Sequence, residues 1–157
     1  MPLPLCPGLL APRFTRGATD GHVAAGLFAL VVVLLVPFLA PDAHWLDAGE
    51  LSVSLFTLGI SHPTGFPLLH IVGKGVMLLP IGGIGFRANL VSALFAGGAV
   101  AFTFLAVRAL TRGSHGPASD NEGAFPAALG AVGLLAVATF WLHATAVEVY
   151  VPTVFLL

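Results

Sequence analysis

Charged residues are scarce in this chain and cysteine is almost absent. Only 8% of the 157 residues are Asp, Glu, Lys or Arg, whereas soluble globular proteins carry roughly 25%. Apolar residues make up 57% and the mean hydropathy is +1.00. The single cysteine, Cys6, cannot form an internal disulfide. This composition excludes a soluble globular domain and indicates an integral membrane protein.

A basic patch is absent as well. The net charge is -1, and the six Lys and Arg residues are scattered singly, so we expect no nucleic-acid partner. The chain has no phosphate-binding loop, dinucleotide glycine fingerprint or nucleophile elbow. The glycine-rich stretch at 82–85 follows no predicted strand and therefore indicates a turn. Soluble cofactor chemistry is unsupported.

Three apolar segments, at about 23–40, 88–108 and 124–142, approach the ~20 residues that a helix needs to cross a bilayer. They predict an all-α, polytopic transmembrane bundle. A cleaved signal peptide is the alternative for the first segment, but that segment is long for one and Pro41 follows it directly. A further apolar segment from Val149 stops with the chain, which suggests a piece of a longer protein. We therefore expect a cytoplasmic segment at 1–21 and the N-terminal part of a membrane domain at 22–157.

The predicted outer loop, 41–87, is itself apolar and contains a turn rich in Pro and Gly at 61–67. On either side of the turn, 51–60 and 67–79 predict short helices. The second would be only ~20 Å long and has Lys74 at its middle, so we expect it to lie at the membrane interface. The alternative, that 67–79 crosses the membrane, would move Arg108 and Arg112 to the opposite side.

With 67–79 at the interface, the arginines on both sides of the predicted spans fall on one side, which the positive-inside rule makes cytoplasmic. These are Arg13, Arg16, Arg108 and Arg112. The same topology places a set of acids on the outer face, with Trp45 and Trp141 at that boundary. The acids are Asp42, Asp47, Glu50 and Glu148.

Asp47 and Glu50 stand three residues apart, so in a helix they share a face. Partial desolvation at a membrane boundary raises the proton affinity of a carboxylate, which suits a general base. The alternative is that Asp47 only caps the following helix and Glu50 is solvated. Glu148, directly after the third predicted span, is a functional candidate for its depth. Its alternative is an ordinary interfacial acid.

The remaining polar candidates are three possible cations. His62, in the turn, could bind a phosphate or orient a carboxylate. Lys74 and Arg87 could bind an anionic lipid headgroup, or could instead snorkel and anchor their helices. A divalent-metal site made of His44, Asp47, Glu50 and His62 is also conceivable, but the spacing of these residues matches no standard ligand pattern.

Four ordered blocks of the sequence are distinctive together. They are Asp-Ala-Gly-Glu-Leu at 47–51, Leu-Gly-Ile-Ser-His-Pro-Thr-Gly-Phe-Pro-Leu at 58–68, Arg-Ala-Asn-Leu-Val-Ser-Ala-Leu at 87–94 and Glu-Val-Tyr at 148–150. From about the first predicted span to its end, the chain resembles a bacterial membrane family of unknown function that is related to protein O-mannosyltransferases. More distantly, it is similar to aminoarabinose transferases and other GT-C glycosyltransferases.

The resemblance implies a GT-C fold and a sugar donor on a polyprenyl phosphate. It implies transfer to a protein or glycan hydroxyl, with inversion, at the outer face of a bacterial inner membrane. Asp47 would be the catalytic base, Glu50 would hold the acceptor or Asp47, and Glu148 would be the second-loop acid. The lipid-linked phosphate would be bound by His62, Lys74 and Arg87.

Two other classes of protein stay open. A transporter or flippase of a lipid-linked substrate would use the same charges along a pathway. A non-catalytic membrane scaffold would not use them. We favour the enzyme because a transport site near the midplane would need broken spanning helices, and the predicted spans have no charge at their centres.

Overall fold

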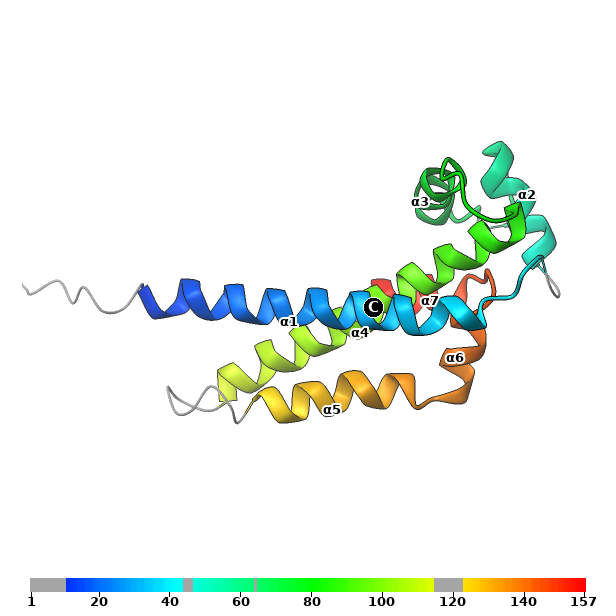
Figure 1. Ribbon diagram of the computed structural model, residues 1–157. Coiled ribbons are helices and arrows are strands. Elements are labelled where there is room, and N and C mark those ends of the chain that lie inside the picture. The colour runs from blue at the N-terminus through cyan, green and yellow to red at the C-terminus, as the bar shows by residue number, and fades with distance from the viewer. Residues whose placement is uncertain (1–10, 44–46, 64, 115–122) are drawn as a thin grey trace, which may run out of the picture.

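The described part of the chain is entirely helical in its regular structure. A computed structural model describes residues 11–43, 47–63, 65–114 and 123–157, and no strand occurs among them. His44 and Trp45, for which the sequence suggested a metal ligand and an interfacial anchor, lie outside the described residues. Figure 1 shows long helices running side by side, with short helices gathered at one end.

Two antiparallel helices, α1 (Ala11–Leu35) and α4 (Ile84–Ser114), form the centre of the fold, and α1 ends in a short 3-10 helix at Val36–Phe38. The segments Thr19–Phe38 and Ile84–Thr111 are long and apolar enough to cross a membrane. Twenty helical residues cover ~30 Å, the thickness of the hydrocarbon core. These segments overlap the first two predicted spans.

The third predicted span, 124–142, is not one straight helix. It consists of α5 (Ala124–Leu135) and α6 (Ala138–Ala144), which meet at an angle of 68°. Val137, between them, has an extended backbone with φ -79° and ψ 114°. No proline or glycine stands at the bend, so tertiary contacts account for it: the backbone carbonyl of Thr145 accepts a hydrogen bond from Ala40 N–H, and Trp141 packs edge-on against Phe38.

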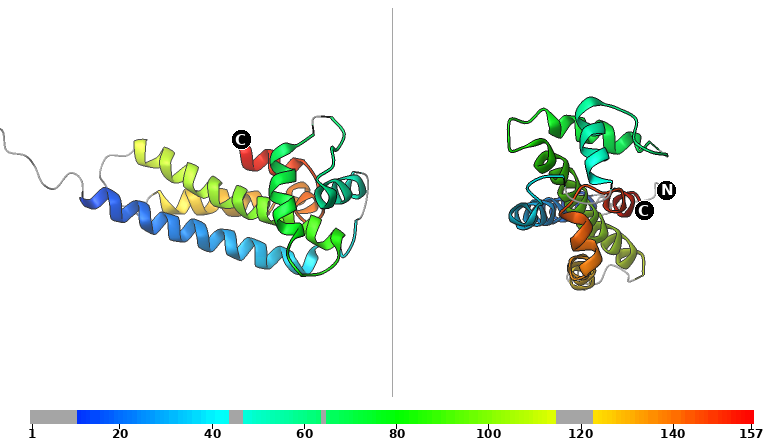
Figure 2. Two further views of the ribbon diagram at one scale, coloured as in Figure 1. Left: turned by 90° about the horizontal axis from the view of Figure 1, so that it is seen from above. Right: turned by 90° about the vertical axis from the view of Figure 1, so that its right-hand side faces the viewer.

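Two short helices, α2 (Ala48–Thr57) and α3 (Pro67–Met77), lie toward the end of the molecule at which α4 begins (Figures 1 and 2). A third, α7 (Tyr150–Leu156), packs against the middle of α4, where Phe155 lies close to Gly98. The sequence predicted α2 at 51–60 and α3 at 67–79. At 11 residues, α3 rises only ~16 Å, too little to cross a bilayer.

The turn between α2 and α3 explains how these helices fold back on each other. Gly65 and Phe66 both have positive φ, +81° and +40°, and Gly65 N–H donates to the His62 carbonyl. Pro67 then occupies the first turn of α3, where its missing N–H costs nothing. Gly73 lets α3 approach closely, because a Cβ there would collide with the Leu55 side chain of α2.

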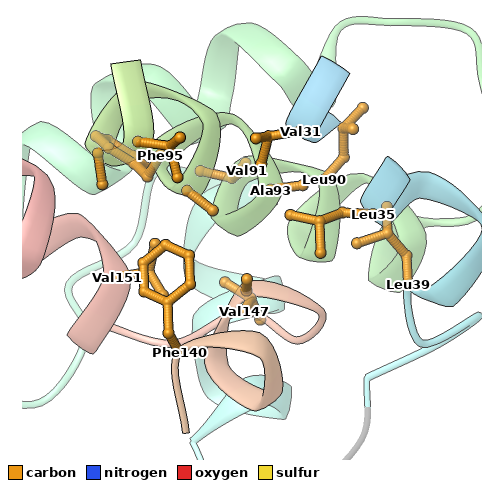
Figure 3. Packing of buried hydrophobic residues seen from close by; sticks show 14 of the residues in the cluster. Val31, Leu35, Leu39, Leu90, Val91, Ala93, Phe95, Phe140, Val147 and Val151 are labelled. Carbon is orange, nitrogen blue, oxygen red and sulfur yellow. The ribbon is translucent and has the colours of Figure 1, made fainter. Parts of the chain in front are cut away.

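The buried core joins helices that are distant in sequence. Figure 3 shows Val31 and Leu35 of α1 beside Val91 of α4, with Val147 and Val151 packing from the chain after α6. All five side chains are 1% exposed or less. The core therefore ties the α6–α7 segment to the first two long helices.

A buried ion pair joins α1 and α4 at the opposite end of the molecule. Arg108 Nε lies 3.2 and 3.1 Å from the two carboxylate oxygens of Asp20, and Arg108 Nη2 also donates to Asp20. Their side chains are 7% and 10% exposed. The sequence indicated a cytoplasmic position for Arg108 but not its partner.

Candidate functional site

The site is built on the first turns of α4, where Asn89 connects three segments. Its side-chain amide donates to the carbonyls of Ala40 and Asp42, at 2.8 and 3.2 Å, and its oxygen accepts from Val147 N–H at 2.8 Å. Asn89 is fully buried. One turn on, the Ser92 hydroxyl accepts from Glu148 N–H at 3.3 Å. These bonds fix the backbone around Glu148.

Gly85, at the start of α4, allows the chain after α1 to pass close to it. A Cβ at Gly85 would collide with the backbone at Asp42 and Ala43. The close approach brings the Ala40 and Asp42 carbonyls within reach of Asn89. A glycine is required here by space, not by backbone conformation.

Asp47, Glu50, His62 and Glu148, which we call the acidic cluster, come from three parts of the chain. His62 joins the two acids of α2: its backbone N–H donates to Glu50 Oε1 at 2.6 Å, and its Nδ1 lies 3.2 Å from Glu50 Oε2. The other ring nitrogen, Nε2, lies 3.9 Å from Asp47 Oδ2. His62 therefore holds Glu50 with one edge and faces Asp47 with the other.

The Asp47 carboxylate is not used for helix capping. Asp47 stands at the N-cap of α2, but its side chain makes no capping hydrogen bond. The side chain is 54% exposed. A capping role, the alternative weighed from the sequence, does not describe this geometry, and the carboxylate faces solvent with His62 behind it.

The environments of Glu50 and Glu148 move their pKa values in opposite directions. The backbone N–H of His62, and then its ring, lower the pKa of Glu50. Burial raises the pKa of Glu148; the charge of His143 opposes that rise, and the charge of Asp47 adds to it. Glu148 is thus within electrostatic reach of Asp47 and His62. Carboxyl groups with separated pKa values can divide acid and base roles.

The two other predicted phosphate ligands are engaged elsewhere. Lys74 Nζ donates to the Phe56 carbonyl and lies 5.5 Å from the centre of the Phe56 ring. Arg87 Nη1 donates to the carbonyls of Met77 and Leu79, at 2.8 and 3.0 Å. Both cations satisfy carbonyls left unpaired near helix ends. Within the described residues, neither cation forms an ion pair with the acidic cluster.

Metal ligation finds no support in the described residues. No group of three or more His, Cys, Asp or Glu side chains among them is arranged to hold a metal ion. His44, one of the four residues considered from the sequence, is outside that part of the chain.

Several contributors to the site were given no role from the sequence. Asn89, Ser92 and Tyr150 fall within the distinctive blocks, and His143 does not. A usable signal existed for Asn89 and Ser92, since polar side chains inside an apolar spanning helix are costly unless bonded. His143 and Tyr150 meet because the chain turns between α6 and α7.

Helices of spanning length define an integral membrane protein of the all-α class. Residues 47–157 match the family model described as Protein O-mannosyl-transferase TMEM260 N-terminal domain, and the chain belongs to this family. The matched region begins at Asp47, after the first span, and contains the whole acidic cluster. The predicted relation to O-mannosyltransferases is confirmed.

A curated relative is the mouse protein named Protein O-mannosyl-transferase TMEM260. It is 34% identical over 111 residues, which cover 69% of this chain and 15% of the relative. The chain therefore spans about 15% of the length of that relative. No solved structure matches the chain significantly.

Proposed function

We propose that the chain is the N-terminal part of a GT-C-type, multi-pass membrane glycosyltransferase. It moves a sugar, with inversion, from a polyprenyl phosphate to a hydroxyl of a protein or glycan. Its active face is extracytoplasmic, in a bacterial inner membrane. The observation that carries the proposal is the acidic cluster, in which an uncapped Asp47 carboxylate stands beside the His62–Glu50 pair.

In the proposed reaction Asp47 is the base. It takes the proton of the acceptor hydroxyl while that oxygen attacks the anomeric carbon from the side opposite the leaving group. The bond from the anomeric carbon to the phosphate oxygen breaks, and its electron pair leaves on the polyprenyl phosphate. General bases of this kind accelerate reactions by roughly 10²- to 10⁴-fold. Glu50 acts through His62, whose ring it holds toward Asp47.

For the donor phosphate, His62 is the best placed of the predicted ligands. It lies within the acidic cluster, and its ring becomes a cation on protonation. Lys74 and Arg87 would have to exchange their carbonyl partners for phosphate oxygens. Glu148, whose pKa is raised by burial, would contact the sugar or the acceptor instead.

Replacing Asp47 tests the base. Asp47→Asn keeps the size of the side chain but removes its basicity, and in the full-length protein in membranes it should lower sugar transfer from a mannosyl polyprenyl phosphate by about 10²- to 10⁴-fold. Asp42→Asn is the matched control, because Asp42 is an exposed acid of the same loop outside the acidic cluster. Equal activity of wild type and Asp47→Asn would remove Asp47 as the base.

A transporter or flippase of a lipid-linked substrate is the second candidate. A transport site near the midplane would need a broken spanning helix, and the third segment is bent by 68°. The break itself, at 136–137, is formed by Ala and Val and offers no charge for a midplane site. If a fluorescent sugar-linked polyprenyl phosphate moved across the membrane of vesicles that contain the protein, and its sugar–phosphate bond stayed intact, transport would be favoured over transfer.

A further inference from the structure

A pair of rings flanks Glu148 of the acidic cluster along the chain, one on α6 and one on α7. His143, in the last turn of α6, and Tyr150, the first residue of α7, have ring centres 4.7 Å apart at an angle of 48°. The chain from one to the other passes through Glu148. His143 is half-buried, but Tyr150 is 59% exposed. The contact fixes one side of an aromatic ring that is otherwise open.

Hydrogen bonds to α4 fix the backbone between the two rings. The bonds from Val147 to Asn89 and from Glu148 to Ser92 anchor the intervening backbone to α4, and both acceptors are fully buried. Among neighbouring charges, that of His143 has the largest effect on the Glu148 pKa, ahead of Asp47 and His62. His143 therefore lies close to the same carboxylate whose pKa Asp47 raises.

We propose that Tyr150 is the platform on which the sugar ring of the donor stacks. His143 is the positioning residue that holds the phenol ring, and the Glu148 carboxylate accepts a hydrogen bond from a sugar hydroxyl. The inference rests on the proposed function and adds a sugar subsite to it. One face of a hexose is a patch of C–H groups and its rim is hydroxyl. An exposed aromatic ring beside a carboxylate matches both parts.

Anchoring in the membrane interface is the competing role for an exposed tyrosine. An anchor contacts lipid and does not distinguish a polyprenyl phosphate that carries mannose from one that lacks it. A stacking platform acts only on the sugar. The sugar-dependent part of the affinity therefore separates the two roles.

The test measures binding of two lipids, a mannosyl polyprenyl phosphate and the same polyprenyl phosphate without sugar, to the full-length protein in nanodiscs. Wild type should prefer the mannosylated lipid. Tyr150→Ala should weaken binding of that lipid by about 3- to 10-fold and leave the sugar-free lipid unchanged. Tyr150→Phe should keep most of the preference, and His143→Gln should lose part of it. Phe125→Ala, which removes a 73% exposed ring from α5, is the matched control.

Three outcomes would overturn the inference: no preference in wild type, an equal loss for both lipids in Tyr150→Ala, or an unchanged preference in that variant. If Tyr150→Ala does not fold, Tyr150→Leu replaces it, because leucine keeps apolar bulk without a flat ring. The same loss of preference for the mannosylated lipid is then expected. Because binding is measured without transfer, it is independent of Asp47→Asn. Transfer that depends on Asp47, together with a preference insensitive to Tyr150, would refute the platform and leave the proposed function standing.

Discussion

At the scale of single residues, the sequence identified the acids but not their partners. The spacing of Asp47 and Glu50 and the imidazole of His62 were readable, and the structure brings them together. Lys74 and Arg87 were read from charge alone as phosphate ligands. Their actual contacts are backbone carbonyls near helix ends, and a sequence does not show which carbonyls another helix leaves unpaired.

Glu148 predicts a measurable dependence of stability on pH. Its folded pKa lies above the ordinary value of 4.5, so between those two values the folded state binds more protons than the unfolded state. Stability from this group is fully present below about pH 4.5 and is lost as pH rises through the folded pKa. Glu148→Gln should remove that loss, so its thermal unfolding midpoint in detergent should exceed that of wild type at neutral pH.

Glu50 provides the control of opposite sign. Its pKa is lowered, chiefly by the His62 backbone N–H, so its contribution to stability is present above the ordinary value of 4.5 and is lost as pH falls through the folded pKa. Glu50→Gln should therefore lose stability at neutral pH relative to wild type. A shift in the same direction for both variants would contradict the assignment of these environments.

At the scale of elements, the length of apolar segments predicted the helices, but the sequence did not predict the bend between two of them. Two spanning segments and two short loop helices were predicted within a few residues of their bounds. The bend between α5 and α6 was missed because hydropathy does not report direction and no proline marks the break. Its cause is the packing of α6 and Thr145 on the chain after α1, which depends on residues more than a hundred positions away.

Asn89 should be the most sensitive polar residue of α4. Asn89→Ala removes the partner of the buried Val147 N–H, and such a buried group costs about 1–3 kcal/mol. It also removes the partly buried bonds to the carbonyls of Ala40 and Asp42. We expect a loss of about 2–4 kcal/mol in the free energy of unfolding, measured by denaturant titration in micelles. Transfer should fall with it, because Glu148 is no longer held.

The matched control for Asn89 is Ser52→Ala. Ser52 is 3% exposed, but its hydroxyl bonds only to Ala48 in its own helix, so its removal should cost less than about 1 kcal/mol. Comparable losses in the two variants would mean that the long-range bonds of Asn89 contribute nothing beyond those of a buried helical hydroxyl.

At the scale of the whole molecule, polar contacts fasten the α1–α4 pair at both ends. Asn89 joins the segments next to the acidic cluster, and the Asp20–Arg108 pair joins the helices at the far end. The sequence predicted that Arg108 and the N-terminal arginines share a side. It did not predict an acid among them, because pairing across two helices depends on their rotation about their own axes.

Breaking the far pair should destabilise the protein strongly, and removing it entirely should not. Arg108→Met leaves Asp20 buried without its arginine, and such changes cost about 3–5 kcal/mol. The double variant Arg108→Met with Asp20→Leu should recover most of that loss. Unfolding midpoints in detergent compare the two. If the double variant were as unstable as the single one, the ion pair would make a net contribution to stability beyond neutralising two buried charges.

The angle between α5 and α6 has a consequence for biosynthesis. Residues 134–138, at the bend, include no proline or glycine, and Ala40 and Phe38 contact the chain beyond it. On leaving the insertion machinery, the stretch 124–144 would therefore be a single continuous rod. Only docking against neighbours that are already assembled would bend the end of this stretch and bring Glu148 toward Asp47, so the proposed site would form last.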